Sequence, residues 1–394
     1  MEGIKNRVAI IGMGCTKFGE RWNASATDLL IEAVHEAYAD AKVEPKDIKA
    51  AWLGTQSTAF SGQLLARSLK LSYIPISRVE NLCATGVDAF RNACYAVAAG
   101  IYDMVLVAGV EKLKDTGYTG LGSLNILPNA NVATPTGPPA AFAMSATAYF
   151  QKYGLATEKG KEFLAQIAVK NHHNGSLSPK AHFQKEITLE QALRSPVIAS
   201  PLSLFDCCGV SDGAAAAIIT RPEIAKSIRH DYVLVKGLGL AVGGDQGMLQ
   251  DDYDFTAFPE TYHAASQAYH EAGITNPRKE LSLVELHDCF TITELITYED
   301  LQLSPRGKAA ADIASGTFTL EGELPVNPDG GLKCFGHPIG ASGIRMIYET
   351  YKQLQGKAGP RQIKDATLGL THSLGGVPGS FACGVSIVGR ADTK

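Results

Sequence analysis

Arg7-Val-Ala-Ile-Ile-Gly12 and Tyr232-Val-Leu-Val-Lys-Gly237 are two short apolar segments, and they decide how this chain of 394 residues is organised. Each is typical of a buried β-strand that ends at a glycine. An alanine-rich helix is predicted after each strand, over residues 26–42 in the first case and 261–274 in the second. This recurrence of one pattern predicts an internal duplication.

The two halves remain alike further along the chain. Each contains a second strand after a proline, a later helix that opens at a glycine-containing tetrapeptide, and a further strand; these are residues 48–53, 83–86 and 104–108 in the first half, and 281–286, 340–343 and 367–371 in the second. Alternating strands and helices predict an α/β protein whose parallel sheets are covered by helices. We place the halves at residues 1–225 and 226–394.

The first half carries a long insertion over about residues 115–200. It begins with a stretch rich in glycine, proline and asparagine at 116–139 and continues with predicted helices at 140–152 and 159–173. Because so long an excursion is uncommon in a compact domain, we expect a functional flap or binding loop.

The composition narrows the class of protein. Hydrophobic residues make up 45% of the chain and charged residues 19%, which is typical of a globular protein. The net charge of −4 argues against a general nucleic-acid binder. The N-terminus lacks the organisation of a signal peptide and no segment has the length of a membrane helix, so we expect a cytoplasmic protein with no membrane association. Its eight cysteines are then expected to be free thiols.

Cys83 is the first candidate for chemistry. It stands between a predicted strand at 76–80 and a predicted helix at 84–99. The positive end of a helix favours thiolate over thiol, so we expect a lowered pKa and a nucleophile. The alternative is a buried core cysteine, as we expect for Cys94 inside the same helix.

His337 lies in a glycine-dense segment, residues 330–343, and is followed by proline. This fixed loop suits a neutral imidazole that accepts a proton from a thiol. His287, Asp288 and Cys289 follow a predicted strand at the end where ligands gather in α/β sheets. A metal site there needs further ligands, and no other segment has a metal-binding spacing, so no metal is expected.

Residues 371–376, Thr-His-Ser-Leu-Gly-Gly, are a further predicted strand-end loop whose backbone N–H groups can face an oxyanion. His372 in this loop either supports the site or is purely structural. The remaining cysteines of interest, Cys207, Cys208 and Cys383, are interpreted as structural.

These segments together resemble the thiolase superfamily over essentially the whole chain. The motifs appear in the order of that family: residues 81–86 (Asn-Leu-Cys-Ala-Thr-Gly), 210–215 (Val-Ser-Asp-Gly-Ala-Ala), 287–290 (His-Asp-Cys-Phe) and 336–343 (Gly-His-Pro-Ile-Gly-Ala-Ser-Gly). The resemblance implies the thiolase fold, two βαβαβαββ halves in a five-layer α-β-α-β-α arrangement with an inserted loop domain. It also implies a homodimer or a dimer of dimers.

The resemblance assigns roles to single residues. Cys83 matches the acylated nucleophile, and His337 matches its base, which also helps to bind the thioester oxygen. Typical bacterial thiolases have Asn-Glu-Ala-Phe where this chain has His-Asp-Cys-Phe, and a catalytic cysteine in the last loop where this chain has none. Sterol-carrier-protein-type and archaeal-type thiolases share the cysteine of the His-Asp-Cys-Phe loop. We therefore assign the second acid/base to Cys289 and the oxyanion-binding place of the asparagine to His287. A second oxyanion hole is expected from the backbone N–H of Cys83 together with Gly375 or Gly376.

The predicted function is thiolytic cleavage of a 3-oxoacyl-CoA, or the reverse condensation, with coenzyme A as a substrate and no bound cofactor. The alternatives are a non-catalytic or partner-dependent thiolase-fold subunit, a cysteine hydrolase, and a thiolase for a bulky substrate such as benzoylsuccinyl-CoA. A β-ketoacyl synthase matches less well, because the order and spacing of its Cys-His-His set are absent. The resemblance also suggests a small zinc-ribbon/OB-fold protein as a partner. The stretch 121–144 is a candidate wall of the substrate pocket.

Overall fold

The computed structural model describes residues 3–117, 137–250 and 252–393. Its first half follows the order β1 (Ala9–Cys15), α1 (Ala26–Ala41), β2 (Ala50–Gly54), α2 (Gln63–Leu69), β3 (Ile76–Val79), α3 (Thr85–Ala98), β4 (Met104–Glu111) and, after the insertion, β7 (Gly213–Thr220). The second half follows with β8 (Val233–Val242), α9 (Pro259–Ala272), β9 (Leu283–Glu285), α11 (Thr291–Asp300), α14 (Ile339–Leu354), β10 (Leu368–Val377) and β11 (Ser380–Arg390). Helix α7 (Pro222–Ile228) connects the halves, and the predicted boundary between residues 225 and 226 falls inside it.

The sheet topology repeats between the halves. The strand order is β3-β2-β4-β7-β1 and then β8-β11-β10-β9, and β1 meets β8 at only two residue pairs. Each half has a parallel pair of strands, β2 with β4 in the first and β9 with β10 in the second. The second strand of each pair is also paired antiparallel, β4 with β7 and β10 with β11. The counterpart of β3 in the second half is reduced to a single parallel bridge between Val284 and Val326. The expected duplication is therefore present, with one strand almost lost.

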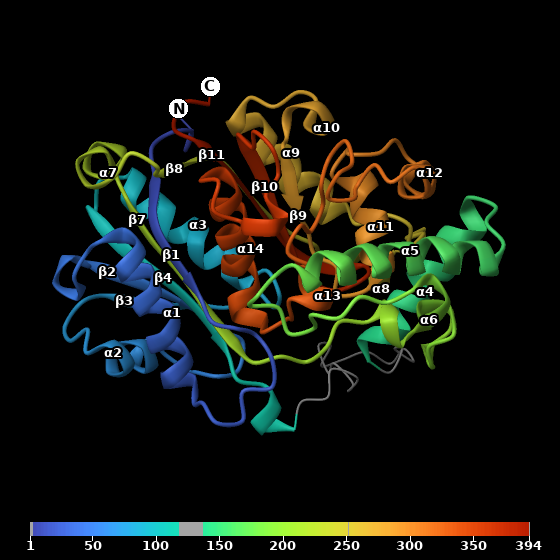
Figure 1. Ribbon diagram of the computed structural model, residues 1–394, viewed down its shortest axis with the longest axis horizontal. Coiled ribbons are helices and arrows are strands. Elements are labelled where there is room, and N and C mark those ends of the chain that lie inside the picture. Colours follow the sequence, from blue (N-terminus) through green and yellow to red (C-terminus); the bar gives the residue numbers. More distant parts are fainter. Residues whose placement is uncertain (1–2, 118–136, 251, 394) are drawn as a thin grey trace.

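The elements stack in five layers, which confirms the expected fold class (Figure 1). Helices α1 and α2 cover the outer face of the first sheet, α3 and α14 lie between the sheets, and α9 covers the outer face of the second. The two central helices approach closely because glycines face each other. A Cβ on Gly86 would lie 3.0 Å from the backbone nitrogen of Gly343. The glycines of both helix-opening motifs are thus explained by packing.

The insertion contributes helices α4 (Pro138–Lys152), α5 (Thr157–Ser176) and α6 (Leu189–Leu193) and the small strands β5 (Val197–Ala199) and β6 (Leu202–Ser203). It packs onto the second half: Phe142 of α4 stacks on Phe290 with ring centroids 4.6 Å apart, and Lys170 of α5 pairs with Glu294 of α11 at 2.6 Å. Most of the glycine-rich stretch 116–139, and with it most of the proposed pocket wall 121–144, lies outside the described residues.

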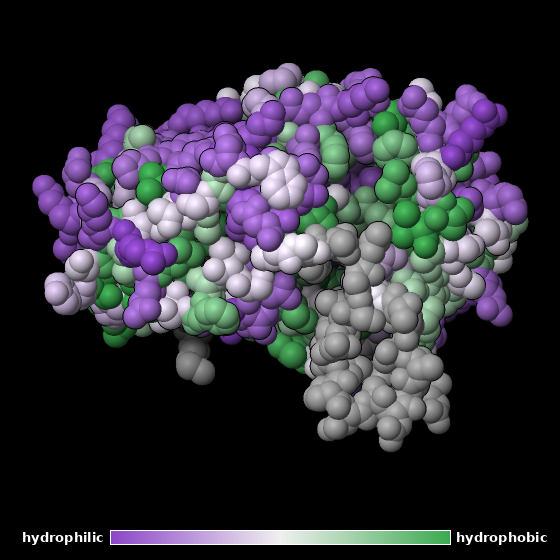
Figure 2. All heavy atoms as spheres, turned by 90° about the horizontal axis from the view of Figure 1, so that it is seen from below, coloured by the Kyte–Doolittle hydropathy of each residue, from purple (hydrophilic) through white to green (hydrophobic). Residues whose placement is uncertain are grey.

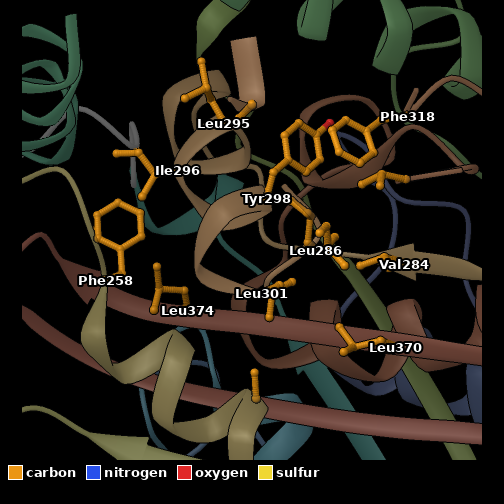
Figure 3. Close-up of a cluster of buried hydrophobic side chains, with 14 of the residues drawn as sticks. Phe258, Val284, Leu286, Leu295, Ile296, Tyr298, Leu301, Phe318, Leu370 and Leu374 are labelled. Carbon is orange, nitrogen blue, oxygen red and sulfur yellow. The ribbon is translucent and has the colours of Figure 1, made fainter. Parts of the chain in front are cut away.

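The core beneath the insertion is apolar and continuous (Figure 3). It includes Leu286 just after β9, Leu295 and Ile296 of α11, and Leu374 of β10. Within it Tyr298 stacks on Phe318, with ring centroids 3.8 Å apart. The outer surface mixes hydrophilic and hydrophobic residues, as Figure 2 shows for one face. No helix in the described part of the chain has the length and hydropathy needed to cross a membrane.

Candidate active site

Cys83 lies on a tight turn between β3 and α3, as the sequence predicted. The preceding residue, Leu82, has a left-handed backbone (φ 51°), which costs on the order of 1 kcal/mol for a residue with a side chain. The Thr85 hydroxyl accepts a hydrogen bond from the Asn81 N–H (2.8 Å) and donates one to the Leu82 carbonyl (2.6 Å). The turn is therefore held in place by the first residue of the helix.

Strand β10 passes directly over this turn. A Cβ on Gly375 would lie 2.5 Å from the backbone nitrogen of Cys83, so only glycine fits there. The backbone N–H groups of Gly376 and of Cys83 itself bond to the Cys83 thiol and work to lower its pKa. Residues 371–376 were predicted to form a loop. That prediction is wrong: they pair with β11 as part of a strand, and their glycines serve the close approach.

The pKa of Cys83 was predicted to be lowered, and the structure contradicts this. Burial, followed by the nearby carboxylates of Glu111 and Glu80, raises the pKa to about 12. These effects outweigh the two N–H groups, because the loss of hydration disfavours the thiolate more than a helix end favours it. Cys83 is therefore a thiol at rest.

His337 presents a free nitrogen to the site. Its Nδ1 lies 2.8 Å from the Ser342 hydroxyl, whose own proton goes to the Pro338 carbonyl (2.9 Å), so Nδ1 must be the protonated nitrogen. Nε2 is buried and has no hydrogen-bond partner among the described residues. Burial and the charge of Arg345 lower the pKa of His337 to about 3, so the ring is neutral. This is the expected state of a base.

His287 faces His337, with ring centroids 5.2 Å apart and the planes nearly perpendicular. A sulfur or ring-nitrogen atom of Cys83, His287 and His337 lies within 4.8 Å of the corresponding atoms of the other two. Burial first, and then the neighbouring histidines, lower the pKa of His287 well below its ordinary value. The structure therefore brings together three of the four predicted catalytic residues, from segments 204 and 50 residues apart in the sequence (83 to 287, and 287 to 337).

His372 supports His287 from beneath. The backbone N–H of His287 donates to Nδ1 of His372 (3.3 Å), so the proton of this neutral ring is on Nε2, which donates to the Thr261 hydroxyl (3.0 Å). Burial lowers the pKa of His372 to about 3. The structure thus gives His372 a place behind the site rather than within it.

Cys289, the fourth predicted residue, is buried with its sulfur 3.7 Å from the Thr293 hydroxyl. Burial, followed by Cys208 and Cys83, raises the pKa of Cys289 well above its ordinary value. Cys208 lies beside it because its N–H donates to the Cys289 carbonyl (2.9 Å), next to a bridge between Cys207 and Phe290. Sequence reasoning treated Cys208 as structural. Nothing in its local sequence distinguishes it, since only this long-range pairing brings it near Cys83 and Cys289.

Asp288 anchors the His-Asp-Cys segment and is not exposed to the site. Its carboxylate accepts from the backbone N–H groups of Leu332 (2.6 Å) and Lys333 (3.2 Å) and from the amide of Asn171 (2.8 Å). Burial, with Glu294 next, raises its pKa to about 7. A side chain on Gly331 would collide with it, at 2.4 Å.

Two buried ionic groups around the site were not predicted. The guanidinium of Arg345 in α14 binds Glu285 (2.5 Å) and Asp329 (2.7 Å). It lies close enough to His287 and His337 for its charge to lower the pKa of both. Glu111, at the end of β4, accepts hydrogen bonds from three consecutive backbone N–H groups at residues 56–58 and from that of Gly340. These residues join the two halves behind Cys83 and fix the start of α14.

Comparison with known proteins supports the resemblance to the thiolase superfamily. The family model for the thiolase N-terminal domain matches residues 8–223, and that for a thiolase C-terminal domain-like region matches residues 241–388. The acetyl-CoA acetyltransferase of Methanothermobacter thermautotrophicus is 37% identical over 95% of this chain and 98% of its own length.

Further relatives agree. Sterol carrier protein 2 of Gallus gallus is 33% identical over 94% of this chain and 70% of its own length. The benzoylsuccinyl-CoA thiolase subunit BbsB of Thauera aromatica is 32% identical over 95% of this chain and 96% of its own length. A solved structure titled as an Ltp2-ChsH2(DUF35) aldolase superposes with a TM-score of 0.84, at 29% identity, over 99% of both chains. The chain therefore belongs to the thiolase family.

Proposed function

We propose that this protein is a thiolase that cleaves a 3-oxoacyl-CoA with free coenzyme A, or runs the reverse condensation, through an acyl group on Cys83. The observation that carries the proposal is the cluster of Cys83, His287 and His337, with their donor atoms within 4.8 Å of one another. The relatives named as acetyl-CoA acetyltransferase and benzoylsuccinyl-CoA thiolase subunit support the same class of chemistry.

Each residue has a defined task in the cleavage direction. His337 Nε2 takes the proton of the Cys83 thiol as the sulfur attacks the β-keto carbon. The developing oxyanion receives the backbone N–H groups of Cys83 and Gly376, which already converge on the sulfur. Because both the thiol and the imidazole are neutral at rest, the proton moves only when the substrate is in place.

The carbon–carbon bond then breaks and leaves the enolate of an acyl-CoA. His287 and the newly protonated His337 donate hydrogen bonds to its oxygen, and Cys289 protonates its α-carbon. The Cys289 thiolate next takes the proton of incoming coenzyme A, whose sulfur attacks the acyl group on Cys83. The acyl–Cys83 bond breaks, and the departing Cys83 thiolate takes back its proton from His337. Two buried thiols with raised pKa values suit this exchange, because each returns to the neutral form at the end of the cycle.

An aldol-type cleavage is the rival that the comparisons raise, since one structural relative is titled an aldolase. That reaction needs a base but no acyl-enzyme. The presence of a thiol beside two imidazole rings favours the thiolase reaction, because a base-only mechanism gives the thiol no task.

We also propose assembly with other chains. Strand β3 is an edge strand of the sheet, and Phe60 and Tyr73 near it are fully exposed, which favours a homodimer through this edge. The names of two relatives mention a subunit and a DUF35 component, which supports a further small partner for this chain. Co-purification from the native source, followed by light scattering, tests both; a fully active monomer contradicts them.

Assays with a panel of acyl-CoA compounds test the reaction itself. We expect acetoacetyl-CoA or a bulkier 3-oxoacyl-CoA to be cleaved only when free coenzyme A is added, and the C83S variant to be inactive. The C94A variant, altered in the core of the same helix, is the matched control and keeps its activity. Cleavage of a 3-hydroxyacyl-CoA by C83S identifies an aldolase, steady release of free acid without coenzyme A identifies a hydrolase, and no reaction with any compound supports a non-catalytic subunit.

A further inference from the structure

The cluster of Cys83, His287 and His337 has the composition of a metal-binding site. One sulfur and two imidazole nitrogens lie within 4.8 Å of one another. Sulfur and imidazole donors in a set of three, with a fourth position open, are typical of reactive zinc sites. No metal was expected from the sequence, because His287 and Cys289 lacked further ligands nearby in the chain. The fold supplies those ligands from residues 83 and 337.

The histidines have unused nitrogen atoms. His337 Nε2 is buried and has no hydrogen-bond partner within the described chain, and the same holds for Nδ1 of His287. The other nitrogen of His337 is fixed as a donor to the Ser342 hydroxyl at 2.8 Å, which is the outer-shell contact that commonly orients a metal-bound histidine. An unsatisfied buried lone pair is costly and gains a partner when a cation binds.

The distances need only a small adjustment. Tetrahedral zinc holds sulfur and nitrogen donors roughly 3.5 Å apart. Because the donor atoms lie within 4.8 Å of one another, no pair has to close by more than about 1.3 Å. The surrounding charge also suits a cation. The carboxylates of Glu111 and Glu80 lie near Cys83, and the positive charge of Arg345 is already matched by Glu285 and Asp329.

We propose that the Cys83–His287–His337 cluster binds a soft divalent cation, Zn²⁺ above all, and that this binding reversibly inhibits the enzyme. The Zn–S bond forms as the S–H bond of Cys83 breaks, and the proton is released to solvent. No redox partner is required. The cation occupies the sulfur that the acyl group needs, so binding of the metal and acylation exclude each other.

Titration of the full-length protein with Co²⁺ and then Zn²⁺ tests the site without using activity. We expect one equivalent of Co²⁺ to give thiolate-to-metal charge-transfer absorption, and Zn²⁺ to displace it. The C83S variant loses the charge-transfer band. The H287N and S342A variants each bind Zn²⁺ about 10- to 100-fold more weakly, the cost typical of losing an outer-shell contact and a lower bound for losing a ligand.

Two controls separate this site from adventitious binding. His173 and Glu186 form an exposed pair (2.9 Å) that is the obvious surface alternative, and the H173A variant should keep the full Zn²⁺ affinity. Cys94 is buried in the same helix as Cys83, and C94A should also bind normally. Protein acylated on Cys83 should not bind Co²⁺. The proposal is overturned if C83S and H287N bind Zn²⁺ as tightly as the wild type, or if H173A loses affinity. Neither result depends on which reaction the enzyme catalyses.

Discussion

Substituting Gly375 by alanine places a methyl carbon 2.5 Å from the backbone nitrogen of Cys83 and 2.8 Å from the carbonyl oxygen of Asn81. Non-bonded heavy atoms pack at about 3.5 Å, so strand β10 and the Cys83 turn must separate by roughly 1 Å. The movement pulls the Gly376 N–H away from the thiol. Losing one oxyanion donor costs about 10²- to 10³-fold in rate, so we expect a fall of that size in G375A.

The assay is single-turnover acylation of Cys83 by acetyl-CoA, followed by rapid quenching and mass spectrometry. The overpacked contact should also lower the free energy of unfolding by about 1–3 kcal/mol. G369A is the matched control: residue 369 lies on the same strand as residue 375 but far from the turn, and its methyl carbon would lie 2.4 Å from the side chain of Thr350 in α14. It should lose stability and keep its acylation rate. Acylation of G375A within about 5-fold of the wild-type rate, or an equal loss in both variants, refutes the assigned oxyanion hole.

Three other predictions address the thiols and the buried ions. The raised pKa of Cys83, about 12, means that its alkylation by iodoacetamide should speed up about tenfold per pH unit between about pH 7 and 10; a plateau below pH 8 would reveal a resting thiolate. C289A should still be acylated on Cys83 by acetyl-CoA, yet its turnover of a 3-oxoacyl-CoA should fall by about 10²- to 10⁴-fold, whereas C383A retains turnover; the reverse pattern in turnover assays contradicts our assignment. R345M leaves two buried carboxylates unpaired and should lower the free energy of unfolding in urea by about 3–5 kcal/mol, against less than about 1 kcal/mol for the exposed R390M. Equal effects of the two arginine substitutions count against a structural role for the buried group.

The duplicated fold was predictable because its signals are local. The apolar runs at 7–12 and 232–237 lie in or directly next to β1 and β8, and the predicted helix at 26–42 ends within one residue of α1. The turn at Cys83 was predictable for the same reason, since a strand and a helix meet there within a few residues.

The features that could not be predicted from the sequence depend on contacts between residues far apart in the chain. The glycines at 375 and 376 indicated a loop, because no local pattern shows that a strand must pass against another turn. The pKa of Cys83 was predicted in the wrong direction because burial and the position of Glu111, 28 residues away, are set by tertiary packing. Arg345 reads as one charged residue of an amphipathic helix, and only the fold reveals that it is fully buried between two carboxylates.

The central claim is that Cys83 carries the acyl group. Brief incubation with acetoacetyl-CoA, followed by denaturation and peptide mass spectrometry, measures this most directly. The account predicts one acetyl group per chain, on the peptide that contains Cys83, and its removal as acetyl-CoA when free coenzyme A is added. Label on another residue, or an acetyl group on Cys83 that coenzyme A does not remove, would contradict it.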